Sequence, residues 1–349
     1  MRVWLGSLLT VLLVVPAAAE IVLPPGFTAQ VYVTGQGFDA GSERGAQGIP
    51  ATSTLAFDAS GTLYLARTGA RFRQGEAQDY SPVYRIPAGG ARLTQDAESR
   101  YLYGPPLPNP QVAVARGRGE VFVTTYDRDR RLGALYRLVD GRAVLFAGGT
   151  PPAGGAPVLR HPEGVALDAA GNVYVADRDQ GVVVRLDPAG KVLNPEFARL
   201  TRPRMLSFDE AGQLWIASDG TAEAPFLDGQ GQLWRASPDG QLTLALEGPL
   251  PAAIGRSPGG ALAFGQRRAG KVLVVTPEGK RIEFASMTEG TTLRGLAFAP
   301  VTPETRRAGI AGDLFLVVIA RSVWALNEVI RVSGPFDEFV RRESQAPSQ

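Results

Sequence analysis

The chain of 349 residues contains no cysteine and a single histidine, His161. The absence of cysteine excludes a disulfide framework, lipid attachment through cysteine and a cysteine nucleophile. One histidine without any cysteine also excludes a zinc centre built from Cys and His ligands. The glycine-rich runs lack the Lys-Ser/Thr ending of a phosphate-binding loop, so they are interpreted as loops.

The sequence also has no large excess of either charge and few long apolar runs. The 36 Lys and Arg residues against 34 Asp and Glu residues give a net charge of +2, with no basic patch, which excludes a nucleic-acid partner. The only extended apolar run lies in MRVWLGSLLTVLLVVPAAAE, where Arg2 precedes an apolar stretch and three alanines follow. This is the pattern of a secretory signal peptide, and the stretch is too short to span a bilayer.

These observations define the expected organisation of the chain. Residues 1–19 are predicted to be a signal peptide, residues 20–340 one folded domain and residues 341–349 a disordered tail. We expect cleavage after Ala19 and export to the periplasm or the outside of the cell. The mature protein should be a monomer without a membrane anchor.

What the sequence has in abundance is glycine and proline, 42 and 27 residues, scattered between short apolar runs. This distribution is typical of an all-β chain with many turns. Two half-motifs interleave six times along the chain. The first, an apolar run, a glycine turn and an aromatic-centred run, occurs around Gly61, Gly119, Gly171, Gly212, Gly260 and Gly312. The second, exemplified by VVRLDPAGKVL, occurs around Gly89, Gly141, Gly190, Gly240, Gly279 and Gly334.

Each repeat holds about four short strands and cannot bury both faces of its sheet alone. Radial packing of such four-stranded antiparallel units around a channel solves this problem. The sequence therefore predicts a six-bladed β-propeller. A strand predicted at 27–35, FTAQVYVTG, precedes the first repeat, and the last repeat is irregular. We expect this N-terminal strand to complete the last blade and close the ring.

The repeat PEGVALDAAGNVYVADRDQGVVVRLDPAG resembles an NHL repeat, and the other units are looser relatives. The six-unit layout is also similar to gluconolactonase-like propellers and to soluble quinoprotein sugar dehydrogenases. The second likeness rests on LPPGFTAQVYVTG near the start and on GDLFLVV and NEVIRVSGPFDEFV near the end. In these families, ligands bind at the channel rim formed by the start of the first strand and the end of the second strand of each blade.

Positions that differ between repeats are the best candidates for function, because shared positions build the scaffold. In the other repeats, the positions equivalent to Glu163 hold Ser53, Gln111, Arg204, Ala252 and Arg294. The positions equivalent to Asp177 hold Arg67, Thr125, Ser218 and Gln266. His161 lies on the same approach loop. The predicted ligand-binding residues are His161, Glu163, Asp177, Arg204, Arg67, Arg294 and Ser218.

Three functions fit this rim. The first is binding of a small polar or anionic ligand, or of a partner protein, with the charges otherwise pairing across the mouth. The second is a metal-dependent lactonase or hydrolase in which Glu163, Asp177, Asp127 and Asp219 bind Ca²⁺. The third is a sugar or aldehyde dehydrogenase dependent on pyrroloquinoline quinone (PQQ).

The resemblances weigh against both enzymes. In gluconolactonase-like enzymes a metal-binding Glu precedes an early blade, where this chain has Ser53. In the quinoproteins a His acts as the general base, where this chain has Asn109. Arginines recur at one phase of the second half-motif, at Arg85, Arg137, Arg185, Arg235 and Arg331, and this repetition indicates a structural role.

Overall fold

The computed structural model describes residues 21–36, 49–50, 52–67, 80–94, 96–151, 153–220, 230–249, 251–267, 269–276, 280–287, 292–319 and 326–346. The expected signal peptide, residues 1–19, and residues 347–349 of the expected tail lie outside them. Among the described residues, no helix has the length and apolar character needed to cross a bilayer.

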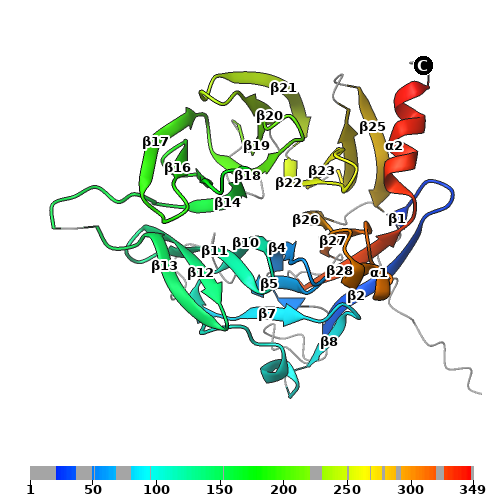
Figure 1. The fold of residues 1–349 in the computed structure, drawn as a ribbon, viewed down its shortest axis with the longest axis horizontal. Coiled ribbons are helices and arrows are strands. Elements are labelled where there is room, and N and C mark those ends of the chain that lie inside the picture. Colours follow the sequence, from blue (N-terminus) through cyan, green and yellow to red (C-terminus); the bar gives the residue numbers. More distant parts are fainter. Residues whose placement is uncertain are drawn as a thin grey trace, which may run out of the picture.

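Antiparallel sheets are arranged radially around a central channel, which confirms the predicted six-bladed propeller (Figure 1). Blade 2 consists of β10 (Gln111–Arg116), β11 (Glu120–Asp127), β12 (Leu132–Val139) and β13 (Arg142–Gly148). Blade 3 consists of β14 (Pro162–Leu167), β15 (Val173–Asp177), β16 (Val182–Leu186) and β17 (Val192–Arg199). Blade 4 consists of β18 (Pro203–Phe208), β19 (Leu214–Ser218), β20 (Gln230–Ala236) and β21 (Leu242–Pro249).

The fifth repeat forms a strand pair at its first glycine turn, as expected. Blade 5 consists of β22 (Pro251–Arg256), β23 (Leu262–Gln266), β24 (Lys271–Val275) and β25 (Arg281–Met287), and β1 (Ile21–Val22) pairs with β25 at its outer edge. Blade 6 contains β26 (Thr292–Phe298), β27 (Leu314–Ile319) and β28 (Leu326–Ser333). Between β26 and β27 this repeat contains the short helix α1 (Pro303–Arg307), which precedes the turn at Gly312.

The N-terminal strand closes the ring. β2 (Thr28–Gln36) pairs antiparallel with β28 and becomes the outer strand of blade 6, as predicted. On its other side β2 pairs in parallel with β8 (Ala91–Thr94) of the first repeat. Chain segments from both ends of the protein therefore lie side by side where the first and last blades meet (Figure 1).

Blade 1 departs from the four-stranded plan. Its sheet consists of β4 (Thr52–Phe57), β5 (Leu63–Arg67) and β7 (Val83–Ile86). Because β8 pairs with β2, residues 101–103 take the outer position and hydrogen-bond to β7 through their backbone. The remaining short elements are β3 (Ile49–Pro50), which pairs with β28, β6 (Tyr80–Ser81), which pairs with β9 (Leu107–Pro108), and the 3-10 helix η1 (Glu98–Arg100).

The core lies between the blades. Successive residues of a strand point to opposite faces, so Val173 and Val175 of β15 pack in the cluster shared with blade 2. Tyr174 and Ala176 pack in the cluster shared with blade 4. All five residues of β15 are therefore buried. This explains why the second strand of each repeat is almost continuously apolar.

A second repeated feature ties the hairpin turns to the sheets. In blades 3 and 4 a turn aspartate accepts a hydrogen bond from the aromatic residue of the second strand: Asp168 from Tyr174 at 3.4 Å, and Asp209 from Trp215 Nε1 at 2.8 Å. The strand-c arginines Arg185 and Arg235 lie over the same rings, each 5.5 Å from the centroid. These repeated arginines therefore have the structural role expected from the sequence.

Blade 5 lacks this arrangement, and a helix takes its place. The equivalent residues are Ser257, Ala263 and Val274. Helix α2 (Phe336–Gln345) covers this blade and buries Phe336, Phe339 and Val340 in the cluster that contains Ala263. The prediction of a disordered tail from residue 341 is therefore wrong for residues 341–345. The buried aromatic face and Lys280, which donates to the carbonyl oxygen of Ala346 at 2.6 Å, hold the last turns in place.

Candidate functional site

The first strands of the six blades line the channel, and their N-terminal ends form one mouth. Next to this end, the pairing of the first strand with the second is irregular in every blade. Pro162 pairs with Asp177, and Pro203 with Ser218, so the start of the first strand and the end of the second share one rim. Such irregularities change the direction in which side chains point. Glu163, Arg204 and Arg294 lie at these irregular strand ends.

Six side chains from blades 3 and 4 form a closed circuit of alternating charge, here called the charge ring. Its ion pairs are Glu163–Arg204 (3.8 Å), Arg204–Asp219 (3.5 Å), Asp219–Arg178 (3.3 Å), Arg178–Asp179 (3.4 Å), Asp179–His161 (3.4 Å) and His161–Glu163 (3.4 Å). Glu163 and Asp219 are fully buried, whereas the side chain of Asp179 is 40% exposed. The ring therefore opens to solvent on the Asp179 side.

His161 is held by three neighbours. Its Nε2 lies 3.4 Å from Glu163 and its Nδ1 lies 3.4 Å from Asp179. Its ring stacks on Tyr126 at a centroid distance of 3.9 Å and an interplanar angle of 9°. Burial would raise the pKa of Asp179, but the hydrogen bond and charge of His161, together with Arg178, lower it overall. The imidazole is thus fixed between two carboxylates.

A second group of charges adjoins the ring. Arg204, Arg267 and Arg294, here called the arginine cluster, come from blades 4, 5 and 6. Burial would lower the pKa of Arg204, but Asp219 and Glu163 outweigh it and raise that pKa. For Arg267, burial and then the positive charges of Arg204 and Arg294 hold the pKa well below its ordinary value. Arg267 is only 4% exposed, so positive charges crowd together out of water.

Asp177 has a structural role at this rim. Its carboxylate accepts hydrogen bonds from the backbone N–H groups of Arg160 at 2.6 Å, His161 at 3.2 Å and Gln180 at 3.0 Å. The side chain of Gln180 donates a further bond at 3.1 Å. An aspartate that caps two loops in this way positions the approach loop of His161. It is fully buried and faces these donors.

The other predicted residues lie apart from the ring or beside it. Arg67 pairs with Glu98 at 3.7 Å in blade 1. Ser218 is fully buried next to Asp219, and its hydroxyl has no hydrogen-bond partner among the described residues. Asp127 accepts from the backbone N–H of Arg130 at 3.0 Å and caps the loop after β11.

The four carboxylates predicted to bind Ca²⁺ do not converge. Asp177 and Asp127 cap loops, and Glu163 and Asp219 pair with arginines. Within the part of the chain that the structure describes, no group of three His, Asp or Glu residues could hold a metal ion. Calcium prefers six to eight oxygen ligands, and these four carboxylates do not supply such a set at one place.

Arg267 was not among the site residues predicted from the sequence. It follows Gln266 by one position, and Arg178 and Asp219 stand at the same phase after Asp177 and Ser218. The residue one step beyond the end of the second strand thus contributes to the site in three blades. The aligned repeats indicate this position as a candidate, because the charge of the residue after the second strand differs from blade to blade.

Inside the channel, a cavity of about 50 Å³ lies between the first strands and is lined by Thr54, Gln111, Met205 and their neighbours. This volume holds one or two water molecules. The side chain of Gln111 is 1% exposed, and neither its oxygen nor its nitrogen has a hydrogen-bond partner among the described residues. A ligand larger than water must therefore lie at the mouth.

The sequence G-R-S-P-G, residues 255–259, matches the spacing of a serine nucleophile motif but is a hairpin turn of blade 5. The hydroxyl of Ser257 donates to Asp337 of α2, and Ser257 is 2% exposed. This turn lies at the end of β22, whereas His161 lies at the mouth, where the first strands begin. A serine–histidine pair is therefore not formed.

Comparison of the sequence with models of known protein families finds no match, and comparison with curated proteins finds none. Solved structures share the fold. A PQQ-bound aldose sugar dehydrogenase from Streptomyces coelicolor is 14% identical, with a TM-score of 0.57 over 89% of this chain and 100% of that one. A gluconolactonase from Xanthomonas campestris is 14% identical, with a TM-score of 0.55 over 82% and 87%. A virginiamycin B lyase from Staphylococcus aureus is 12% identical, with a TM-score of 0.51 over 90% and 99%.

These likenesses establish the six-bladed architecture and its similarity in layout to lactonase and sugar dehydrogenase propellers. They carry no chemistry to this chain at such identities. The arginine cluster at the mouth suits carboxylates, and a ligand of cofactor size would lie there, because the cavity inside the channel holds only about 50 Å³. Asn109, which stands where the quinoproteins have their base, donates to the backbone oxygen of Tyr126 at 2.9 Å.

Proposed function

We propose that the protein binds a small anion at the channel mouth, through the arginine cluster. The observation that carries this proposal is the crowding of three guanidinium groups at the mouth. Arg267 is 4% exposed, and burial, followed by the positive charges of Arg204 and Arg294, holds its pKa well below the ordinary value. A bound carboxylate or phosphate would favour the charged form of this group and form charge-assisted hydrogen bonds with the cluster.

Neutral polar groups beside the cluster support a ligand with polar atoms beyond its anionic group. Gln111 and the hydroxyl of Ser218 are buried with unsatisfied hydrogen-bonding capacity among the described residues. A buried amide left without a partner costs free energy, and a ligand or water molecule removes that cost. The class of ligand is therefore a small anion that also carries hydrogen-bonding groups.

Replacement of Arg267 by Met tests the proposal because it should affect affinity far more than stability. The charged form of Arg267 is disfavoured first by burial and then by the positive charges of Arg204 and Arg294. The ligand-free variant should therefore lose less stability than the about 3–5 kcal/mol that removal of one partner of a buried ion pair costs. Its anion binding should be lost. The control is Arg256→Met, an exposed arginine at the other end of β22 in the same blade.

The measurement is the thermal unfolding midpoint in phosphate, citrate and gluconate at constant ionic strength, followed by calorimetric titration. A ligand at one hundred times its dissociation constant stabilises the folded state by about 2.7 kcal/mol. We expect this rise in the wild type and in Arg256→Met only. Equal responses of wild type and Arg267→Met, or no response to any of the three anions, would contradict the proposal.

We also propose that the protein is exported. The support is the signal-like sequence of residues 1–19, with its early arginine, apolar stretch and alanines before Glu20. Mass spectrometry of the protein recovered from the periplasm or the medium should find Glu20 at the N-terminus. Recovery of a chain that still begins at Met1 would contradict export by cleavage.

A further inference from the structure

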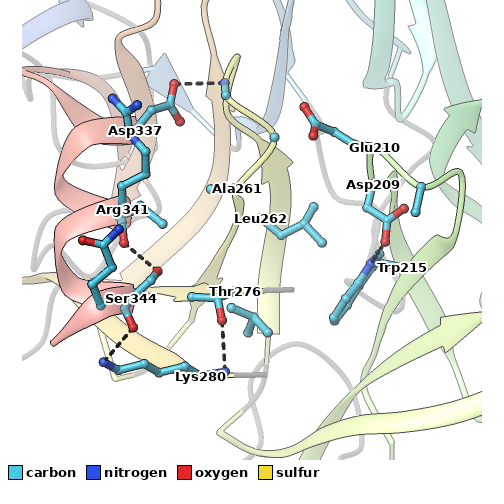
Figure 2. A pocket seen from close by; sticks show the side chains of 16 residues that line it. Asp209, Glu210, Trp215, Ala261, Leu262, Thr276, Lys280, Asp337, Arg341 and Ser344 are labelled. Carbon is cyan, nitrogen blue, oxygen red and sulfur yellow. Dashed lines mark hydrogen bonds between the residues drawn. The ribbon is translucent and has the colours of Figure 1, made fainter. Parts of the chain in front are cut away.

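A larger cavity lies on the face opposite the mouth. It has a volume of about 970 Å³ and lies between the hairpin turns of blades 4 and 5 and the inner side of α2 (Figure 2). Because these turns follow the C-terminal ends of β18 and β22, the cavity is separated from the charge ring by the length of the strands. We call it the α2 groove; its walls include Glu210, Trp215, Leu262, Val275, Val340 and Arg341.

The α2 helix is fixed over this groove at both of its ends. Asp337 in its first turn accepts hydrogen bonds from the hydroxyl of Ser257 and from the backbone N–H of Gly259, the latter at 2.9 Å. At its other end, Lys280 donates to the carbonyl oxygens of Glu343 and Ala346. A cation at this position also suits the helix dipole. The groove is therefore a built feature of the fold with two anchored walls.

The floor of the groove is apolar. Trp215, Leu262, Val275 and Val340 are each between 5% and 7% exposed and face the cavity from four different elements. Apolar pockets of several hundred Å³ with a few polar groups are typical ligand sites. The floor predicts a ligand whose body is apolar.

Most charged groups around the groove are already committed. Asp209 accepts from Trp215, Asp337 accepts from the turn of blade 5, and Lys280 caps α2. Glu210 and Arg341 are different: both are exposed, and neither side chain makes an ion pair or hydrogen bond with another described residue. Figure 2 shows them on opposite sides of Leu262, Glu210 on the blade 4 side and Arg341 on α2.

The turn of blade 5 places the carboxylate of Glu210 at the rim. A Cβ atom on Gly260 would lie 2.4 Å from Cδ of Glu210, so the carboxyl group rests against the bare backbone there. Gly260 has φ +93°, a conformation that favours glycine. The turn of blade 5 therefore holds the carboxylate of Glu210 over the apolar floor.

We propose that the α2 groove binds a short apolar peptide with free ends, with its ammonium group at Glu210 and its carboxylate at Arg341. A carboxylate wall, a guanidinium wall and an apolar floor match the two charges and the side chains of such a peptide. A single amino acid would leave most of the 970 Å³ unfilled. A purely anionic ligand is disfavoured by the carboxylates of Asp209, Glu210 and Asp337, so this site differs in ligand class from the channel mouth.

The test is calorimetric titration with Ala-Leu-Ala, Ala-Leu-Leu-Ala and Ala-Leu-Leu-Leu-Ala. At least one should bind to the wild type, and acetylation of its N-terminus should weaken binding about 10- to 100-fold, as expected for one charge-assisted hydrogen bond. Glu210→Gln should weaken binding of the free peptide by a similar factor and leave binding of the acetylated peptide unchanged. Arg341→Gln should behave in the same way towards the C-terminally amidated peptide.

Two matched controls lie on the same helix outside the groove lining. Glu338→Gln and Arg342→Gln should bind the peptide as the wild type does. All four residues are exposed, so the variants should keep the wild-type unfolding midpoint. Arg267→Met should also bind the peptide normally, which separates this site from the channel mouth. The proposal is overturned if none of the peptides binds, if Glu210→Gln and Arg341→Gln bind them unchanged, or if the controls weaken binding equally.

Discussion

The carboxylate of Glu163 is fully buried and lies between His161 and Arg204. Removing one partner of a buried ion pair leaves the other charge uncompensated, which costs about 3–5 kcal/mol. We therefore expect Glu163→Gln to lower the free energy of unfolding by this amount in denaturant titrations.

Glu196 provides the comparison for Glu163. It pairs with Arg199 at the surface, where the side chains are 58% and 63% exposed. Its replacement by Gln should cost less than about 1 kcal/mol. A loss of stability in Glu163→Gln no larger than in Glu196→Gln would show that the charge ring contributes little to the fold.

The phenol groups predict loss of stability at high pH. Burial raises the pKa of Tyr32 to about 12, although a backbone hydrogen bond and Arg331 oppose it. Burial also raises the pKa of Tyr64 and Tyr84. A raised pKa in the folded state gives stability that is complete below the unfolded value near 10 and is lost as the pH rises towards 12.

Absorbance at 295 nm should therefore show these phenols ionising well above pH 10, together with unfolding. In denaturant titrations, Tyr32→Phe should have a shallower decline of stability between pH 10 and 12 than the wild type. If the two proteins decline in parallel, Tyr32 does not contribute to the alkaline transition.

Part of the site followed from the sequence at the residue scale. The repeat alignment brings Glu163 and Arg204 to one rim, because equivalent positions of adjacent blades meet around a channel. It could not show that Asp177 is occupied by backbone donors, since those bonds depend on the path of two loops. It also could not show that Arg267 is held among positive charges, because that depends on three blades meeting at one place.

At the scale of elements, α2 replaces a feature that blade 5 lacks. In blades 1, 3 and 4 the turn aspartates Asp58, Asp168 and Asp209 accept backbone N–H bonds within their own turns. Blade 5 has Ser257 at this position, and Asp337 supplies the carboxylate from α2. Residues 341–345 are polar and charged, so their sequence alone indicates a tail. Their helix depends on this docking and on buried Phe336 and Phe339.

Asp337→Ala should lower the free energy of unfolding by about 1.5–3 kcal/mol, because hydrogen bonds to a charged group are lost. The double variant Ser257→Asp, Asp337→Ser moves the carboxylate into the turn, as in the other blades, and should recover most of that loss. Denaturant titration measures both, with Glu338→Ala as the control on the same helix. No recovery in the double variant would mean that the two carboxylate positions are not interchangeable.

At the scale of the whole molecule, the repeats were sufficient to predict the number of blades and the closing strand. Each repeat has two apolar faces, and the structure buries them in clusters between neighbouring blades. The parallel pairing of β2 with β8 did not follow from the sequence. The partner of the short strand β8 depends on the path of residues 101–103, which occupy the outer position next to β7 in the folded ring.

Closure of the ring by β2 can be tested directly because two valines of this strand differ in burial. Val33 is fully buried where blades 6 and 1 meet, whereas Val31 is 46% exposed. Val33→Asp places an unpaired carboxylate in the closing core and should destabilise the protein by several kcal/mol, since buried charges need partners. Val31→Asp should change the free energy of unfolding by about 0.5 kcal/mol or less. Both substitutions alter the N-terminal segment by the same charge, so their difference in chemical denaturation reports on closure alone. Equal and small effects would mean that the ring is stable without its N-terminal strand.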